Sequence, residues 1–174
     1  CPLGHVRRPV VGAPSCSPCA EGPADRDRDP PPECVTCSTG QYAPEAAVAC
    51  TDCVAGQSDV DANPATGCIE CEAGHYAAAA SVGDCVECLA GEADLDSNPA
   101  TACVACDTGT FAVQGSVTCN DCVPGTADLD LSPATECAAC MPGQYQGELG
   151  STLCVDCTSG QYAPEAAVAC TDCV

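Results

Sequence analysis

Cysteine pairs of the form Cys-x-x-Cys recur along the whole chain. Twenty of the 21 cysteines lie in ten such pairs, which are separated by segments of 12 to 14 residues. The pairs are Cys16 and Cys19, Cys34 and Cys37, Cys50 and Cys53, Cys68 and Cys71, Cys85 and Cys88, Cys103 and Cys106, Cys119 and Cys122, Cys137 and Cys140, Cys154 and Cys157, and Cys170 and Cys173. Thiols at this spacing can form structural disulfides, four-thiolate zinc sites or redox-active dithiols. Cys1 lies 15 residues before Cys16, and we interpret it as the second half of a further pair.

Structural disulfides are favoured over the two other kinds of thiol chemistry. The pairs stand in strict tandem, and the chain has only two histidines and no basic surface, which argues against zinc or iron–sulfur sites. No βαβ pattern surrounds any pair, which argues against a redox-active dithiol. We therefore expect all 21 cysteines to form disulfides in an oxidising compartment, with the protein extracellular or at a cell surface.

The spacing narrows the disulfide connectivity to two schemes. In a ladder, the second cysteine of each pair bonds the first of the next, as in Cys19–Cys34. In a crossed scheme, blocks such as Cys34–Cys50 with Cys37–Cys53 alternate with unlinked connectors. The ladder pairs Cys1 with Cys16 and leaves only Cys173 to bond beyond Val174. We favour the ladder, and the crossed scheme stays open.

Carboxylates are the second group of side chains whose spacing indicates chemistry. Three 14-residue segments, 54–67, 89–102 and 123–136, carry Asp-x-Asp followed by Pro-Ala-Thr, and we call them Asp segments. Oxygens at alternate positions suit Ca²⁺, the one cofactor that the sequence suggests. The competing interpretation is an Asx-type turn before proline, because no bidentate glutamate closes the loop. The candidate calcium ligands are Asp52, Asp59, Asp61, Glu87, Asp94, Asp96, Asp121, Asp128 and Asp130.

A second type of segment carries a Gly-x-aromatic motif. These aromatic segments are residues 38–49, 72–84, 107–118, 141–153 and 158–169. Their aromatic residues, predicted to pack on a disulfide or on the neighbouring repeat, are Tyr42, Tyr76, Phe111, Tyr145 and Tyr162. Aromatic and Asp segments alternate from Cys34, except that two aromatic segments adjoin at 141–169. In both types a glycine stands third after the cysteine pair, which predicts a turn with positive φ.

Composition excludes an ordinary hydrophobic core. Leucine, isoleucine, valine and phenylalanine make up about 14% of the chain, and the net charge is −21. Such values are typical of disorder, unless disulfides restrict the unfolded chain instead. We predict a small disulfide-rich fold, an elongated tandem-repeat rod with short β-strand pairs and almost no helix. No stretch of this fragment is apolar enough to be a transmembrane segment.

The repeats define the domain organisation. Residues 1–33 read as an irregular, Pro- and Arg-containing cysteine-rich segment, in which Pro30–Pro32 and the charged run 25–29 form a connector. Residues 34–174 read as tandem repeats with a two-segment unit of about 34 residues. Residues 160–174 copy residues 40–54 at an offset of 120, and we interpret the chain as a piece of a longer array.

Charge and motif content exclude several function classes. All four arginines lie in the first 28 residues, and residues 29–174 carry 22 acids and no lysine or arginine. Nucleic-acid binding is excluded because phosphates need cations. No nucleophile–base constellation or phosphate-binding loop is present, so we predict no enzymatic activity. The serines and threonines are compatible with O-glycosylation, which would make the protein a glycoprotein.

The repeats from residue 34 onward resemble a known group of extracellular modules. The run Cys103-Val104-Ala105-Cys106-Asp107-Thr108-Gly109-Thr110-Phe111 is similar to ephrin-receptor-like cysteine-rich repeats, which belong to the broader growth-factor-receptor cysteine-rich group. The Asp-Leu-Asp-Ser-Asn-Pro-Ala-Thr stretch resembles cysteine-rich repeat proteins of protist cell surfaces. The resemblance implies an extracellular, elongated and non-enzymatic fold.

Two functions follow as hypotheses. The first is a structural protein of an extracellular filament, a surface coat or a flagellar hair, with other copies of itself as partners in a homopolymer or continuous array. The alternative is a receptor or adhesion ectodomain that binds a protein partner or Ca²⁺.

Overall fold

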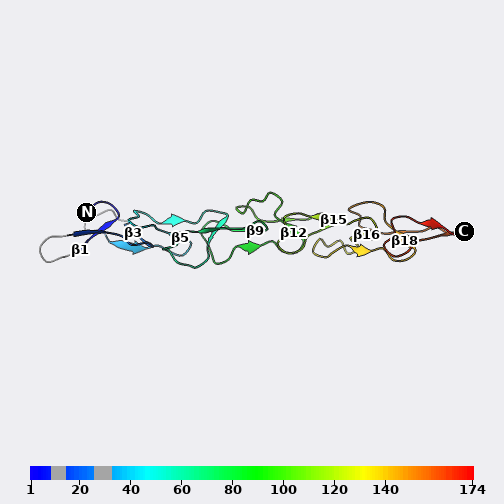
Figure 1. The fold of residues 1–174 in the computed structure, drawn as a ribbon, viewed down its shortest axis with the longest axis horizontal. Coiled ribbons are helices and arrows are strands. Elements are labelled where there is room, and N and C mark those ends of the chain that lie inside the picture. Colours follow the sequence, from blue (N-terminus) through cyan, green and yellow to red (C-terminus); the bar gives the residue numbers. More distant parts are fainter. Residues whose placement is uncertain (9–14, 26–32) are drawn as a thin grey trace. The chain divides into compact units, whose positions relative to one another are not determined.

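The computed structural model describes residues 1–8, 15–25 and 33–174, in which short strands are joined by turns (Figure 1). The described residues form no helix, so none could cross a lipid bilayer as one. Most of the predicted Pro/Arg connector falls in 26–32, outside the described residues. The chain divides into two compact units. One comprises Cys1–Glu72, Tyr76–Val86 and Asn98–Thr101; the other comprises Ala73–His75, Glu87–Ser97 and Ala102–Val174.

The strands are two to four residues long and are numbered along the chain. They are β1 (His5–Arg8), β2 (Ser15–Pro18), β3 (Pro23–Asp25), β4 (Cys34–Thr36), β5 (Gln41–Tyr42), β6 (Thr51–Asp52), β7 (Gln57–Asp59), β8 (Ile69–Glu70), β9 (His75–Tyr76), β10 (Ser81–Val82) and β11 (Val86–Glu87). They continue with β12 (Glu92–Ala93), β13 (Val104–Ala105), β14 (Thr110–Phe111), β15 (Asn120–Asp121), β16 (Thr126–Ala127), β17 (Ala138–Ala139), β18 (Gln144–Tyr145), β19 (Val155–Asp156), β20 (Gln161–Tyr162) and β21 (Thr171–Asp172).

One strand-pairing scheme serves every segment. The strand after a segment's glycine pairs with the two residues inside the next cysteine pair, as β14 pairs antiparallel with β15 and places Phe111 opposite Asn120. Strand β7 pairs antiparallel with β8 in the same way, and also carries the parallel strand β10 on its other side. Strand pairs are therefore found at every Gly-x-aromatic motif, which confirms the predicted short pairs.

Ten disulfides form a ladder, in which the second cysteine of one pair bonds the first of the next with Cα atoms 5.4 to 5.8 Å apart. They are Cys1–Cys16, Cys19–Cys34, Cys37–Cys50, Cys53–Cys68, Cys71–Cys85, Cys88–Cys103, Cys106–Cys119, Cys122–Cys137, Cys140–Cys154 and Cys157–Cys170. The ladder prediction is confirmed and the crossed scheme is wrong.

Cys173 is the one cysteine for which the expected disulfide is not found within residues 1–174. Its thiol is free and exposed, as a ladder requires at this position. Its expected disulfide stays a prediction.

The glycine of each segment adopts the predicted left-handed conformation, with φ between 77 and 96°. Its carbonyl accepts a hydrogen bond from the second cysteine at the far end of the segment, as Gly109 O accepts from Cys122 N at 2.9 Å. Glycine suits this turn because a side chain penalises positive φ. Each segment is thus closed twice, by a disulfide and by a backbone hydrogen bond.

Glycine also allows alternate segments to stack closely. A Cβ at Gly109 would lie 2.0 Å from the carbonyl oxygen of Gly150, two segments further on. In the second unit, aromatic segments stack on aromatic segments in this way, while a Cβ at Gly91 would lie 3.0 Å from the backbone of Ala134, in the next Asp segment. Within this unit, segment 107–118 therefore stacks on segment 141–153, and segment 89–102 stacks on segment 123–136.

The core consists of cysteine and alanine. Small residues such as Ala24, Ala93 and Ala127 are buried, and so is the second cysteine of eight successive pairs; Ala24 packs with Cys37 and Ala93 with Cys106. These buried cysteines are Cys19, Cys37, Cys53, Cys71, Cys88, Cys106, Cys122 and Cys140. Among the described residues no leucine, isoleucine, valine or phenylalanine is buried. Stacked backbones in close contact leave space for small side chains only, so the disulfides replace the apolar core.

The pair of adjacent aromatic segments changes this stacking pattern. A Cβ at Gly125, in an Asp segment, would lie 2.3 Å from the carbonyl oxygen of Ala166, in the aromatic segment 158–169. That segment therefore occupies the position that a further Asp segment would take. A parallel bridge between Tyr145 and Ala167 joins the two adjoining aromatic segments.

Candidate functional site

A buried carboxylate links each aromatic segment to the Asp segment that follows it. Gly109 N donates to Asp128 Oδ2 at 2.9 Å, Gly74 N to Asp94 Oδ2 at 3.1 Å, and Gly40 N to Asp59 Oδ2 at 3.0 Å. Gly4 N donates to Asp25 Oδ2 at 3.0 Å in the same way. These aspartates are between 1 and 5% exposed. A hydrogen bond from a backbone N–H to a buried charged acceptor is worth about 1.5–3 kcal/mol, so each contact contributes to the cohesion between segments.

The other segment junctions use a backbone acceptor at the same position. The acceptor always lies three residues after the glycine of the following segment. Where that residue is not aspartate, its carbonyl accepts instead, as Ala112 O accepts from Gly91 N at 2.8 Å and Ala163 O from Gly143 N at 2.9 Å. Nine successive glycines of the described residues, from Gly4 to Gly143, are bonded to the next segment by one version or the other.

The buried aspartates differ in whether their second carboxylate oxygen, Oδ1, accepts a hydrogen bond. Asp128 Oδ1 accepts from Ser132 N at 3.1 Å. Asp94 Oδ1 is buried without a hydrogen-bond partner among the described residues. Because desolvating a carboxylate oxygen without a partner is unfavourable, the junction at Asp94 is less completely satisfied than the one at Asp128.

The second aspartate of each motif forms a turn. Asp61 accepts from Asn63 N at 3.0 Å and from the Thr66 hydroxyl at 2.9 and 3.0 Å. Asp130 makes the same bonds to Ser132 N and Thr135. The threonine hydroxyl and then the backbone N–H hold the pKa of both carboxyls below the ordinary value. The Asx-type turn is confirmed at these two aspartates.

The structure places eight of the nine candidate calcium ligands in three settings. The first aspartates, Asp59, Asp94 and Asp128, bond to glycines, and Asp61 and Asp130 form turns, while Asp96 makes interactions of its own. The acids inside the cysteine pairs lie on hairpin strands, where Asp52 accepts from Gln41 Nε2 at 2.7 Å and Glu87 from Gln114 Nε2. Asp121 lies opposite Thr110. Within 1–8, 15–25 and 33–174, no three acidic, histidine or cysteine residues gather as a metal site. Calcium binding stays a prediction.

The aromatic residues stand second in their hairpin strands. Tyr42, Tyr76, Phe111 and Tyr145 are half-buried, and Tyr162 is 54% exposed. None of them belongs to the buried core of cysteines and alanines. In the strand pairing, Tyr42 lies opposite Thr51 and Tyr145 lies opposite Val155.

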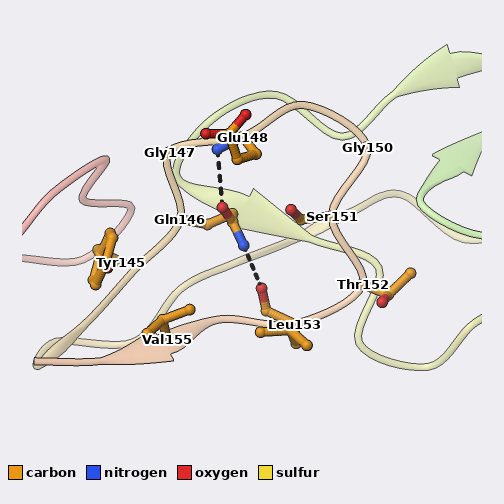
Figure 2. Close-up of a pocket in the computed structure, with 9 residues that line it drawn as sticks. All are labelled: Tyr145, Gln146, Gly147, Glu148, Gly150, Ser151, Thr152, Leu153 and Val155. Atoms are coloured by element: carbon orange, nitrogen blue, oxygen red, sulfur yellow. Dashed lines mark hydrogen bonds between the residues drawn. The ribbon is translucent and has the colours of Figure 1, made fainter.

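An open cavity of about 530 Å³ lies in the aromatic segment 141–153, in the second unit. Figure 2 shows Gln146 across the interior of this segment, where its Nε2 donates to Leu153 O at 2.8 Å and its Oε1 accepts from Glu148 N at 2.9 Å. The lining residues are Tyr145, Gln146, Gly147, Glu148, Gly150, Ser151, Thr152, Leu153 and Val155. The mixed polar and apolar lining allows hydrogen bonding beside an apolar contact.

Sequence reasoning missed two of these residues. Asp25 is bonded like the other buried aspartates, so the described part of 1–33 shares the frame of the repeats. The signal is the motif Gly-x-Ala-Asp, which stands at 22–25, 91–94 and 125–128. Gln146 is buried where the other aromatic segments have alanine, and this replacement of an apolar repeat position was visible in the sequence.

The predicted disulfide cysteines divide into two groups by their surroundings. The second cysteine of eight successive pairs, such as Cys71, Cys88 or Cys140, lies in the buried core, whereas Cys157 is half-buried. Their partners, Cys85, Cys103 and Cys154, are only half-buried. Each of these disulfides therefore connects the core to the outer hairpin strands, as a structural cross-link does.

Comparison with protein-family models finds no matching family, and comparison with curated proteins finds no significant relative. The resemblance to receptor-type cysteine-rich repeats therefore stays a prediction, carried by the cysteine and glycine spacing alone.

Proposed function

We propose that this chain belongs to a non-enzymatic structural protein of an extracellular filament, a surface coat or a flagellar hair. The observation that carries the proposal is the repetition of one bonding scheme. Each segment is closed by its own disulfide and bonded through its glycine to the next segment. Ten disulfides also indicate an oxidising environment, such as that of secreted proteins.

Local and repeated cohesion suits an array of variable length. Stability in such proteins is approximately a sum of segment terms and nearest-neighbour terms, so adding segments extends the array without a new core. The proposed partners are accordingly other copies of the chain, in a homopolymer or a continuous array. The acidic charge of residues 29–174, which contain no lysine or arginine, would then be masked by cations or by the arginines of residues 7–28.

Negative-stain electron microscopy of the protein purified from its natural source tests this proposal. We expect fibres or a regular coat, and disulfide mapping should then find Cys173 bonded to a cysteine outside residues 1–174. Isolated monomeric particles, with Cys173 bonded inside residues 1–174, would overturn the proposal.

The alternative, a receptor or adhesion ectodomain, is favoured by one observation. The cavity in segment 141–153 is lined by Gln146, which replaces the alanine of the other aromatic segments, and one repeat that differs from its neighbours is expected of a binding patch. Replacing the exposed Leu153 by aspartate would test it. Loss of adhesion to cells that carry the partner, with the disulfide ladder intact, would support this alternative.

A further inference from the structure

The aromatic segment 158–169 has an internal counterpart of nearly the same sequence. Residues 160–174 repeat residues 40–54 without a change. Both stretches form the same hairpin, in which the glutamine lies opposite an aspartate and the tyrosine opposite a threonine. The segment that covers the first copy therefore indicates what kind of segment would cover the second.

An Asp segment covers the first copy through three contacts. Gly40 N donates to Asp59 Oδ2 at 3.0 Å. Ala43 N donates to Pro64 O, also at 3.0 Å. The same proline lies against the segment before the hairpin, where a Cβ at Gly22 would lie 3.4 Å from Pro64 C. One carboxylate, one carbonyl and one close backbone approach thus hold this Asp segment in place.

The same three groups of the second copy have no partner among the residues that the structure describes. Neither Gly160 N nor Ala163 N donates a hydrogen bond, and a Cβ at Gly143 would meet no atom within 4 Å. Gly143 is the counterpart of Gly22, because Gly143 N donates to Ala163 O at 2.9 Å as Gly22 N does to Ala43 O at 2.8 Å. Ala163 is only 5% exposed, and buried backbone N–H groups are nearly always paired.

We propose that the surface formed by Gly143, Gly160 and Ala163 binds a further Asp segment of the array. The inference rests on the proposed structural function and names the type of segment that the surface takes. Recognition needs a carboxylate for the Gly160 amide and, five residues later, a proline carbonyl for the Ala163 amide. A further segment has to supply them, because each aspartate of this kind already bonds a glycine of its own chain: Asp25, Asp59, Asp94 and Asp128.

An aromatic segment is the competing occupant. It would offer the Gly160 amide a backbone carbonyl, as Ala163 O accepts from Gly143 N. An Asp segment is favoured because the covered stretch has the same sequence in both copies and an Asp segment lies over the first. A carboxylate is also the stronger acceptor for a backbone N–H.

Cys173 serves as a covalent reporter beside this surface. Its thiol is exposed, and its counterpart Cys53 bonds Cys68 at the far end of the covering Asp segment. The probe is an acetylated peptide of residues 55–70 whose Cys68 carries glutathione as a mixed disulfide. When the peptide is added to residues 1–174, the Cys173 thiolate attacks the Cys68 sulfur, a new disulfide forms and glutathione leaves as its thiol. Docking of the peptide raises the equilibrium yield of this adduct, which mass spectrometry measures while disulfide mapping verifies the ladder.

Peptide variants identify the contact. Asp59→Ala should lower the equilibrium constant of the adduct about tenfold or more, because the charged acceptor is lost. Glu70→Gln removes the same charge outside the Asp segment and should leave the constant unchanged. An aromatic peptide of residues 108–121, linked through Cys119, should form less adduct than the peptide of the Asp segment.

Hydrogen exchange in the adduct locates the bound peptide. The amides of Gly160 and Ala163 should exchange at least about tenfold more slowly than in the free protein. Equal yields from the unchanged and Asp59→Ala peptides would overturn the proposal, and so would unchanged exchange at both amides. A higher yield from the aromatic peptide would assign the surface to an aromatic segment instead.

These outcomes are separate from failure of the proposed function. Fibres in the native material without docking of the peptide would leave the structural function in place and remove only this contact. Docking of the peptide beside monomeric native particles would keep the site and remove the structural function.

Discussion

Substituting alanine at two equivalent glycines separates backbone strain from segment stacking. Gly109 and Gly143 have φ of 83 and 87°, so alanine is strained at both, by about 1–2 kcal/mol. A Cβ at Gly109 would lie 2.0 Å from Gly150 O, whereas a Cβ at Gly143 would have no atom within 4 Å. Gly143→Ala is thus a matched control for Gly109→Ala. Replacing glycine by alanine also stabilises the protein by lowering the conformational entropy of the unfolded chain, and this contribution is the same in both variants.

The additional effect at Gly109 follows from the contacts that must open. Relieving the clash requires the two segments to separate by more than about 1 Å. That movement disrupts the hydrogen bond from Gly150 N to Cys122 O, at 2.9 Å, and the one from Gly109 N to Asp128 Oδ2, also at 2.9 Å. Typical values for a neutral and a charge-assisted hydrogen bond add to about 2–4 kcal/mol.

Hydrogen exchange of the Gly150 amide measures this difference directly. With the disulfides intact, exchange of this amide reports local opening of the stacked segments. We expect Gly109→Ala to speed its exchange about 30-fold to 1,000-fold more than Gly143→Ala does. Equal exchange rates in the two variants would refute the reasoning, because the stacked backbones would then have accommodated the Cβ at no energetic cost.

Three further predictions concern other parts of the frame. Asp128→Ala should destabilise the junction to Gly109 by about 1.5–3 kcal/mol, whereas Asp128→Asn should retain most of that stability because its amide oxygen still accepts; exchange of the Gly109 amide compares the two. Thr135→Val should raise the pKa of Asp130 toward the ordinary 3.8, as NMR titration would show. Since the folded pKa is lowered, the stability from this bond is present above pH 3.8 and is lost as the pH falls through the folded pKa. Reduction should abolish protease resistance while EDTA leaves it intact, and loss of structure with EDTA alone would contradict a disulfide-dependent fold.

The sequence was sufficient to predict the covalent frame. The ladder follows from the even spacing of the cysteine pairs, because a repeated segment type at 141–169 disturbs a crossed scheme and leaves a ladder unchanged. Positive φ at the segment glycines followed from their constant place, since only glycine adopts that turn without strain. Short strand pairs followed from the absence of any helical periodicity.

The contacts between segments could not be predicted in the same way. Strands of two residues are too short to show periodicity, and stacking between alternate segments is a backbone contact without a side-chain signature. Asp59 and Asp61 look alike in the sequence, yet one is buried against Gly40 and the other forms an exposed turn. The two aspartates differ because the preceding aromatic segment packs against Asp59 and not against Asp61, and this tertiary contact cannot be read from the sequence.

The ladder also has a mechanical consequence. Under tension, the force passes through each disulfide and bypasses the residues between its two cysteines. With Cα atoms 5.4 to 5.8 Å apart across each of ten disulfides, and about 10 Å across each Cys-x-x-Cys, the fully stretched oxidised chain reaches roughly 160 Å between Cys1 and Cys173. The reduced chain would reach about 600 Å at roughly 3.5 Å per residue. In the oxidised protein about three-quarters of the contour length therefore lies inside disulfide-closed loops, and this length can extend under force only after the disulfides are reduced.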